Sequence, residues 1–121
     1  MSLYIDEDGT ITLVQGDSGE IIVSGLDKNK NYDVYFAIQT LKRQPVASEI
    51  KVQSNFSDMV TFVLTAEFTD LLTVPKSKEY EIYQYGIKLC TTDTEDTALI
   101  ANNDYGSVNR LIVYPKIVEG V

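Results

Sequence analysis

The chain has 121 residues, 44% of them hydrophobic and 23% charged, a balance typical of one globular domain. Its net charge of −8, with Lys42-Arg43 as the longest basic cluster, argues against direct binding to nucleic acid or to an anionic membrane. No apolar run approaches the roughly 20 residues of a membrane span, and the acidic N-terminus does not resemble a signal peptide, so we expect synthesis in the cytosol.

Short runs of β-branched and aromatic residues, separated by turn residues, predict an all-β fold. The expected strands cover, in chain order, residues 3–5, 10–15, 20–24, 32–41, 47–53, 59–65, 79–92, 98–101 and 109–114. About eight or nine such strands bury their apolar faces as an antiparallel β-sandwich, with a small barrel as the competing architecture. We therefore expect a single β-sandwich domain over residues 1–121.

Two local patterns add detail in the first half of the chain. Asp8-Gly9 is a hairpin signal between the first two strands. In the long strand at 32–41, apolar residues alternate with more polar ones, which indicates one buried face. The residues expected on that face are Val34, Phe36 and Ile38.

In the second half, residues 66–72 carry apolar side chains at helical rather than strand spacing. Thr65 is a suitable N-cap, so a short helix is expected there. The strand at 79–92 should bury one face, which carries Tyr83, Tyr85, Ile87 and Leu89. Gly86 on the opposite face indicates a bulge or a closely approaching neighbour, and the acidic, threonine-rich stretch 91–97 is expected to be a loop.

The string Gly16-Asp17-Ser18-Gly19 matches the sequence around the nucleophile of trypsin-like serine proteases. That chemistry needs a base to take the serine proton, and the chain contains no histidine. The chain is also about half the length of a two-barrel protease, and Glu20 and Ile21 replace the residues that usually follow the string. We interpret it as a strand-joining turn, in which the side chains of Asp17 and Ser18 bond the local backbone.

Three further groups of residues could carry chemistry, and each has a simpler interpretation. Asp6, Asp8 and Gly9 imitate part of a calcium loop but lack the glutamate that closes an EF-hand, so a hairpin turn is expected. A second group contains four carboxylates: Asp93, Glu95, Asp96 and Asp104. A pair of them could serve a glycoside hydrolase as general acid and base, but the simpler interpretation is a solvated loop. Cys90 is the only cysteine and is expected to be a buried, inert thiol. We therefore predict no enzymatic activity, no catalytic residue, no cofactor and no metal site.

Eight tyrosines are many for this length, and most fall on long strands where sheet packing explains them. Tyr4, Tyr105 and Tyr114 are better placed to form a contact surface. Asn55-Phe56-Ser57 fits a glycosylation sequon, which we interpret as accidental in a cytosolic chain. Ile117 and Val118 form an apolar tail that could add as a strand to another sheet.

The order of these features resembles tailed-bacteriophage baseplate and tail proteins that have an immunoglobulin-like N-terminal domain. The resemblance begins at 11–23, where a strand is followed by Gly-Asp-Ser-Gly and a second strand. It continues in the strand segments 32–38 and 60–65. The stretches 83–90 and 114–120 are similar to the closing part of small prophage proteins. The resemblance implies an immunoglobulin-like β-sandwich that is a virion or assembly component, and it brings no catalytic residue.

We therefore expect a non-enzymatic structural or assembly protein of a phage or prophage tail or baseplate, associated with the virion. Its expected partners are copies of itself or other tail proteins, reached through strand edges and tyrosine-rich surface. The alternative is a carbohydrate- or receptor-binding β-sandwich module. Because the chain ends soon after the domain, we do not expect the receptor-directed region that many baseplate proteins carry.

Overall fold

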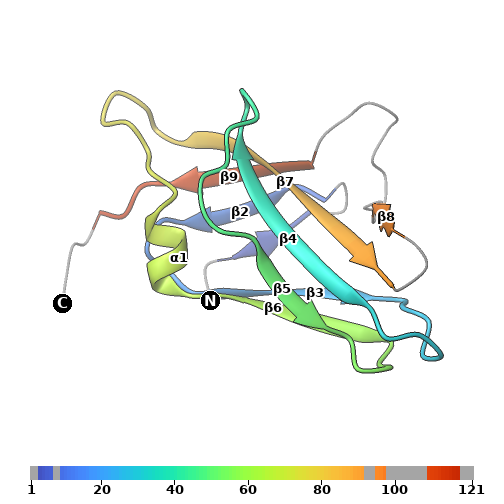
Figure 1. Ribbon diagram of the computed structural model, residues 1–121. Coiled ribbons are helices and arrows are strands. Elements are labelled where there is room, and N and C mark those ends of the chain that lie inside the picture. The colour runs from blue at the N-terminus through green and yellow to red at the C-terminus, as the bar shows by residue number, and fades with distance from the viewer. Residues whose placement is uncertain (1–2, 7–8, 92–94, 98–108, 118–121) are drawn as a thin grey trace.

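Strands make up most of the chain in the computed structural model, which describes residues 3–6, 9–91, 95–97 and 109–117. These ranges contain nine strands and one short helix (Figure 1). The elements are β1 (Tyr4–Ile5), β2 (Ile11–Val14), β3 (Gly19–Ser24), β4 (Asp33–Thr40), β5 (Ile50–Gln53), β6 (Met59–Leu64), α1 (Ala66–Asp70), β7 (Glu81–Cys90), β8 (Glu95–Thr97) and β9 (Asn109–Tyr114). The described helix is too short to cross a membrane.

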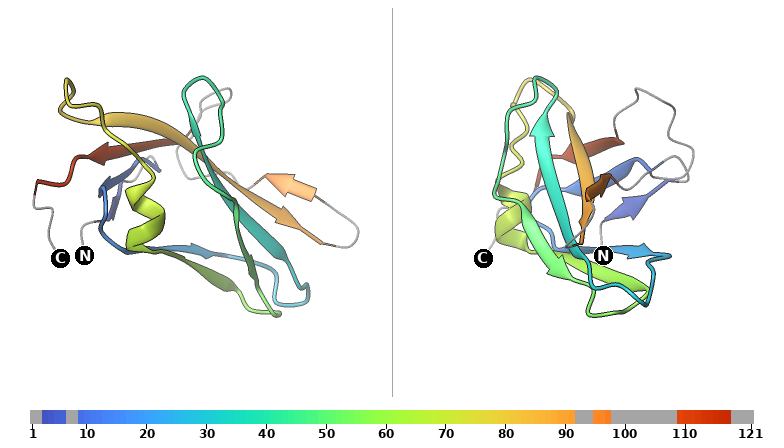
Figure 2. Two further views of the ribbon diagram at one scale, coloured as in Figure 1. Left: turned by 60° about the vertical axis from the view of Figure 1, so that its left-hand side comes forward. Right: turned by 45° about the vertical axis from the view of Figure 1, so that its right-hand side comes forward.

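The strands form two facing sheets, which confirms the predicted β-sandwich. The larger sheet has the order β1-β2-β9-β7-β4-β5, with β8 also paired to β7, and the smaller contains β3 and β6. Figure 2 shows the smaller sheet beneath the strongly curled larger one, with α1 at one end between them. One pair departs from the antiparallel expectation, because β2 runs parallel to β9. The chain leaves β2 for the other sheet and returns to its side only at β9, so no hairpin constrains their directions.

The core lies between the sheets and follows the alternation of the sequence. The inward residues of β4 are fully buried, as predicted: Val34, Phe36 and Ile38 are at most 2% exposed. On β7, Tyr83, Tyr85 and Ile87 are buried and Leu89 is partly buried against the core, again as predicted. The Phe36 ring contacts those of Phe62 and Tyr85, with both centroid distances 5.6 Å, and so joins the two sheets.

The two buried tyrosines also satisfy their hydroxyl groups. Tyr83 donates to the Thr73 carbonyl oxygen and Tyr85 donates to that of Gly9. Burial raises the pKa of the Tyr83 phenol, because an ionised phenolate would be poorly solvated there. Both tyrosines therefore act as core residues that also hold neighbouring loops in place.

The predicted helix is present, and it begins as expected. Thr65 is its N-cap, and the Thr65 Oγ1 accepts a hydrogen bond from the Phe68 amide at 3.1 Å. The helix ends at Asp70, two residues earlier than predicted. Leu72 nevertheless lies fully buried in the core, so the apolar spacing that suggested a longer helix reflects burial beyond the helix end.

Three expectations about β7 and its surroundings were wrong. The pairing of β4 with β7 runs through Ala37 and Gly86 without interruption, so there is no bulge. A Cβ atom added to Gly86 would meet no atom within 4 Å, so no neighbour approaches it closely. The stretch expected as a loop contains β8, whose residues Glu95–Thr97 pair with β7. The strand expected at 98–101 lies outside the described residues.

The turn from β5 to β6 carries an unusual conformation. Asn55 and Phe56 have φ angles of 50° and 60°, and the Ser57 amide donates to the Ser54 carbonyl at 3.0 Å. Positive φ at both central positions favours Asn-Gly, and a phenylalanine in the second position is strained. The Phe56 ring is 59% exposed, so core packing does not offset this strain.

We expect Phe56→Gly to raise the free energy of unfolding by about 1 kcal/mol, because glycine adopts positive φ without a Cβ clash. Urea unfolding would measure the change. Phe56→Ala is the matched control, since it removes the same exposed ring but keeps the strained Cβ, and it should leave stability nearly unchanged. Equal effects of the two variants would contradict the strain argument.

Candidate functional site

The Gly16-Asp17-Ser18-Gly19 string forms the turn that carries the chain from β2 in the larger sheet to β3 in the smaller one. Gly16 has a φ of +86°, which favours glycine. Gly19 packs against Leu3, and an added Cβ would lie 2.7 Å from the Leu3 Cβ. The backbone conformation therefore explains the glycine at position 16, and the close packing of Leu3 explains the one at position 19. The turn joins two strands, as predicted.

The contacts of this turn differ from those expected. The side chains of Asp17 and Ser18 are exposed. The backbone groups of Gly16 and Asp17 are instead hydrogen-bonded to the Thr69 side chain of α1. The Thr69 hydroxyl donates to the Asp17 carbonyl at 2.7 Å and accepts from the Gly16 amide at 3.1 Å. Thr69 is 1% exposed, so it is the buried point that fixes the turn to the helix. Sequence reasoning missed it, since nothing local links Thr69 to residues more than fifty positions away.

Surface contacts extend this corner to the end of β9. Gln15 Nε2 donates to the Asp70 carbonyl at 2.9 Å, and Lys116 Nζ lies 2.8 Å from Asp70 Oδ1. Lys116 and Asp70 side chains are 37% and 50% exposed, so this ion pair contributes little to stability. These contacts hold α1, the turn and the end of β9 together.

The acidic candidates do not assemble into a site within the described ranges. Asp6 and Gly9 belong to the predicted hairpin, in which the Gly9 amide donates to the Asp6 carbonyl at 3.0 Å, and Asp8 lies outside the described residues. Of the proposed carboxylate cluster, Asp93 and Asp104 also lie outside, whereas Glu95 and Asp96 belong to β8. No group of three or more aspartate, glutamate or cysteine side chains able to hold a metal occurs in the described part of the chain. Cys90 is partly rather than fully buried, because it lies at the end of β7.

The tyrosines expected at a contact surface are exposed where the structure describes them. Tyr4 is 63% exposed, and Tyr114 is 42% exposed with its ring 5.7 Å from that of Tyr80. Tyr105 and Val118 lie outside the described residues, whereas Ile117 is 92% exposed. Asn55 of the sequon lies in the exposed turn before β6.

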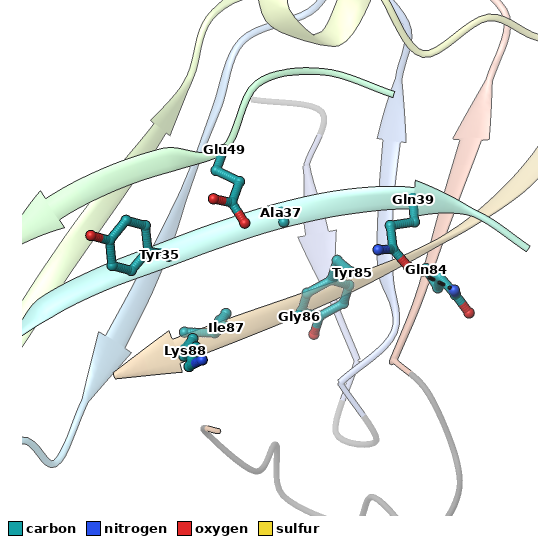
Figure 3. Close-up of a pocket in the computed structure, with 9 residues that line it drawn as sticks. All are labelled: Tyr35, Ala37, Gln39, Glu49, Gln84, Tyr85, Gly86, Ile87 and Lys88. Atoms are coloured by element: carbon teal, nitrogen blue, oxygen red, sulfur yellow. Dashed lines mark hydrogen bonds between the residues drawn. The ribbon is translucent and has the colours of Figure 1, made fainter. Parts of the chain in front are cut away.

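A hollow of about 260 Å³ lies on the outer face of the larger sheet, over β4 and β7 (Figure 3). It exists because the two smallest outward residues, Ala37 and Gly86, are directly opposite each other. Tyr35 and Lys88 lie on one side of this pair and Gln39 and Gln84 on the other. The sequence pattern singles out Gly86 but does not predict the hollow. The hollow depends on which residue of β4 lies opposite Gly86, and only the strand pairing shows that this residue is Ala37.

Polar groups of several kinds border the hollow. Gln84 Nε2 donates to Gln39 Oε1 at 3.2 Å, which orders the two amides side by side. Glu49 adds a carboxylate, and the Tyr35 ring has Lys51 Nζ 5.9 Å from its centroid. Amide, carboxylate and aromatic groups around a shallow surface can bind a neutral polyhydroxylated molecule.

The outer face of the smaller sheet is different in character, because it carries a cluster of exposed apolar side chains, called the apolar face below, beside the charged Glu20 and the polar Ser24. Ile22 of β3 and Val63 of β6 are each 55% exposed, and Met59 is 46% exposed. Their register places these side chains on one face, opposite the inward Val60, Phe62 and Leu64. The alternation in the sequence separates the two faces of β6, but only the tertiary structure shows that nothing described covers the outer one.

Comparisons with known proteins bear on the fold alone. The sequence matches no protein-family model and no curated protein. The structure is similar to a crystal structure of the periplasmic chaperone SfaE, with a TM-score of 0.54 and 10% sequence identity. The match covers 93% of this chain and 56% of that one, so the chain spans just over half the length of the chaperone. The neighbour has an immunoglobulin-like fold, so the chain is an immunoglobulin-like β-sandwich, as predicted.

Proposed function

We propose that this chain is a non-enzymatic structural or assembly protein of a phage or prophage tail or baseplate, acting through protein–protein contacts. It is made in the cytosol and becomes part of the virion, and it needs no cofactor. The observation that carries the contact role is the exposed apolar face of the smaller sheet, formed by Ile22, Met59 and Val63. The tail or baseplate setting rests on the sequence resemblance.

An apolar sheet face of this kind favours a partner for a physical reason. Covering it removes apolar surface from water, at roughly 25 cal/mol per Å². Scattered apolar residues are ordinary on a protein surface, but here three lie together on two adjacent strands. The net charge of −8 favours solubility of the free chain and opposes non-specific association before the chain meets its partner.

The test is incorporation into particles. Source cells are treated with a DNA-damaging agent, particles are purified, and the chain is sought by mass spectrometry at stoichiometric copy number. Val63→Lys should lower that copy number, because it replaces one of the three apolar contact side chains with a charged one. Gln53→Lys, which adds the same charge at an exposed position of β5 in the other sheet, should not. Particles without the chain, or unchanged incorporation of Val63→Lys, would refute the proposal.

A carbohydrate- or receptor-binding role is the second candidate, and the hollow over Ala37 and Gly86 favours it. We would screen a glycan array with the wild-type chain and then with Gly86→Leu, which fills the hollow where nothing lies within 4 Å. Specific binding should be lost in Gly86→Leu and in Tyr35→Ala, but kept in Tyr114→Ala, which removes an exposed ring that does not line the hollow. Absence of any specific glycan, or binding that Gly86→Leu retains, would exclude this candidate.

A further inference from the structure

Strand β6 offers an unpaired edge that carries no charged residue. It pairs with β3 on one side, and no described residue pairs with it as a strand on the other. Its six residues are Met59, Val60, Thr61, Phe62, Val63 and Leu64. Natural proteins protect free edges with charges, short strands or bulges, and β6 uses none of these.

The other free edges are protected. In the larger sheet, β5 carries Lys51, β1 has only two residues, and β8 has only three. In the smaller sheet, the opposite edge strand, β3, carries Glu20. The contrast singles out β6 as the edge that best accepts a further strand.

We infer that β6 pairs antiparallel with β6 of a second copy of this chain, about a two-fold axis at Thr61. This inference deepens the proposed function and rests on it, since it names a partner that contacts Met59 and Val63, two of the three residues of the apolar face. With that register, Thr61 faces the second copy's Thr61, and Met59 faces the second copy's Val63. Threonine pairs and apolar cross-strand pairs both stabilise antiparallel sheets.

The register is consistent with the burial of each side chain. Thr61, Met59 and Val63 lie on the outer face, so the added pairs bring together Met59 and Val63, which are now 46% and 55% exposed. Val60 and Phe62 point inward and are at most 5% exposed, so they keep their places in the core. The two small sheets become one continuous four-stranded sheet across the interface, and like charges do not meet within it.

Charge also explains why a second copy would use this edge. Two chains of net charge −8 repel each other, and contact through an uncharged strand keeps their carboxylates away from the interface. Because salt screens the remaining repulsion, self-association should strengthen as ionic strength rises. A contact held by surface ion pairs would weaken instead.

Sedimentation velocity over a range of concentrations tests the inference on the full chain. The wild type should form a dimer, and Thr61→Lys should weaken it at least about tenfold by placing two like charges opposite each other. Ser24→Lys is the matched control, since Ser24 is an exposed residue of β3 that lies one strand away from the interface and is not one of the contact residues of the apolar face. Ser24→Lys should leave the dimer within about twofold of the wild type.

A mixing experiment tests the two-fold symmetry directly and shows that the variants remain folded. Thr61→Glu alone should also be monomeric, whereas an equimolar mixture of Thr61→Lys and Thr61→Glu should form a heterodimer, because opposite charges then meet at the axis. Cooperative urea unfolding confirms that each variant is intact. A monomeric wild type, a dimer that Thr61→Lys leaves unchanged, a dimer disrupted equally by Ser24→Lys, or a mixture that stays monomeric would each overturn the inference.

These results separate the inference from the proposed function. A monomer in solution that still enters particles, and whose Val63→Lys variant does not, would refute self-pairing and support the assembly role through a different partner. A dimer that behaves as described but is missing from particles would support self-pairing and refute the role in the tail or baseplate.

Discussion

Thr69→Val should lower the free energy of unfolding by about 2 kcal/mol, a large effect for an isosteric substitution. The Thr69 hydroxyl is the shared partner of the Gly16 amide and the Asp17 carbonyl, and the residue is 1% exposed. Valine keeps the volume but removes both of these hydrogen bonds and the contact of the hydroxyl with the Ala66 carbonyl at 3.2 Å, so the Gly16 amide and the Asp17 carbonyl lose the partner that Thr69 supplies. A typical intramolecular hydrogen bond contributes about 0.5–1.5 kcal/mol net, so the loss of the two part-buried bonds to the turn accounts for the expected effect.

Chemical unfolding of the variant measures this loss, and Thr12→Val is the matched control. Thr12 lies half-exposed on β2, so the same exchange there should change stability by no more than about 0.5 kcal/mol. If the two variants were equally stable, the turn would not depend on the threonine. A large loss for Thr69→Val alone would show that the hydrogen bonds between α1 and the turn stabilise the fold.

Gly19→Ala should destabilise the fold by about 2 kcal/mol, because the added methyl group would overlap Leu3. It would lie 2.7 Å from the Leu3 Cβ and 2.8 Å from its Cδ1, closer than real Cβ contacts allow. Because the Leu3 Cβ is attached directly to the backbone, a rotamer change cannot relieve the overlap. Leu3 packs against the core, so the segment before β1 must move and lose that packing.

Gly86→Ala provides the matched control for this prediction. Gly86 is also a strand glycine, but a Cβ there meets nothing within 4 Å, so alanine should raise stability by about 0.5 kcal/mol. Thermal or urea unfolding of both variants gives the comparison. In a Leu3→Gly background, which removes the Leu3 Cβ, Gly19→Ala should cost less than in the wild type, and an unchanged cost would contradict the proposed overlap.

The strained turn at Phe56 supports the idea that this end of the smaller sheet is used for contact. An exposed aromatic residue with positive φ lowers stability, and it lies three residues before β6. Backbone strain of this kind tends to occur at functional positions. The predicted gain from Phe56→Gly and the predicted dimer edge at β6 thus concern neighbouring residues, and can be measured on the same purified chains.

The amino-acid sequence by itself determined most of the described strands, with β8 as an exception, and the buried faces of β4 and β7. Val34, Phe36 and Ile38 alternate with more polar residues, and that period of two is sufficient to identify a strand with one buried side. Thr65 marked the start of α1 because N-cap preference depends on only the next few residues. No catalytic residue was expected, and the assembly role remains a proposal.

Only the tertiary structure decided which strands pair and which surfaces result. Three contacts join segments that are far apart in the sequence. They are the parallel pairing of β2 with β9, the hydrogen bonds of Thr69 to the Gly16 turn, and the contact of Gly19 with Leu3. The hollow over Ala37 and Gly86 and the open edge of β6 also depend on pairing partners. Side-chain periodicity is a local property of the chain, whereas pairing is selected by burial over the whole molecule, so one sequence pattern is compatible with many pairings.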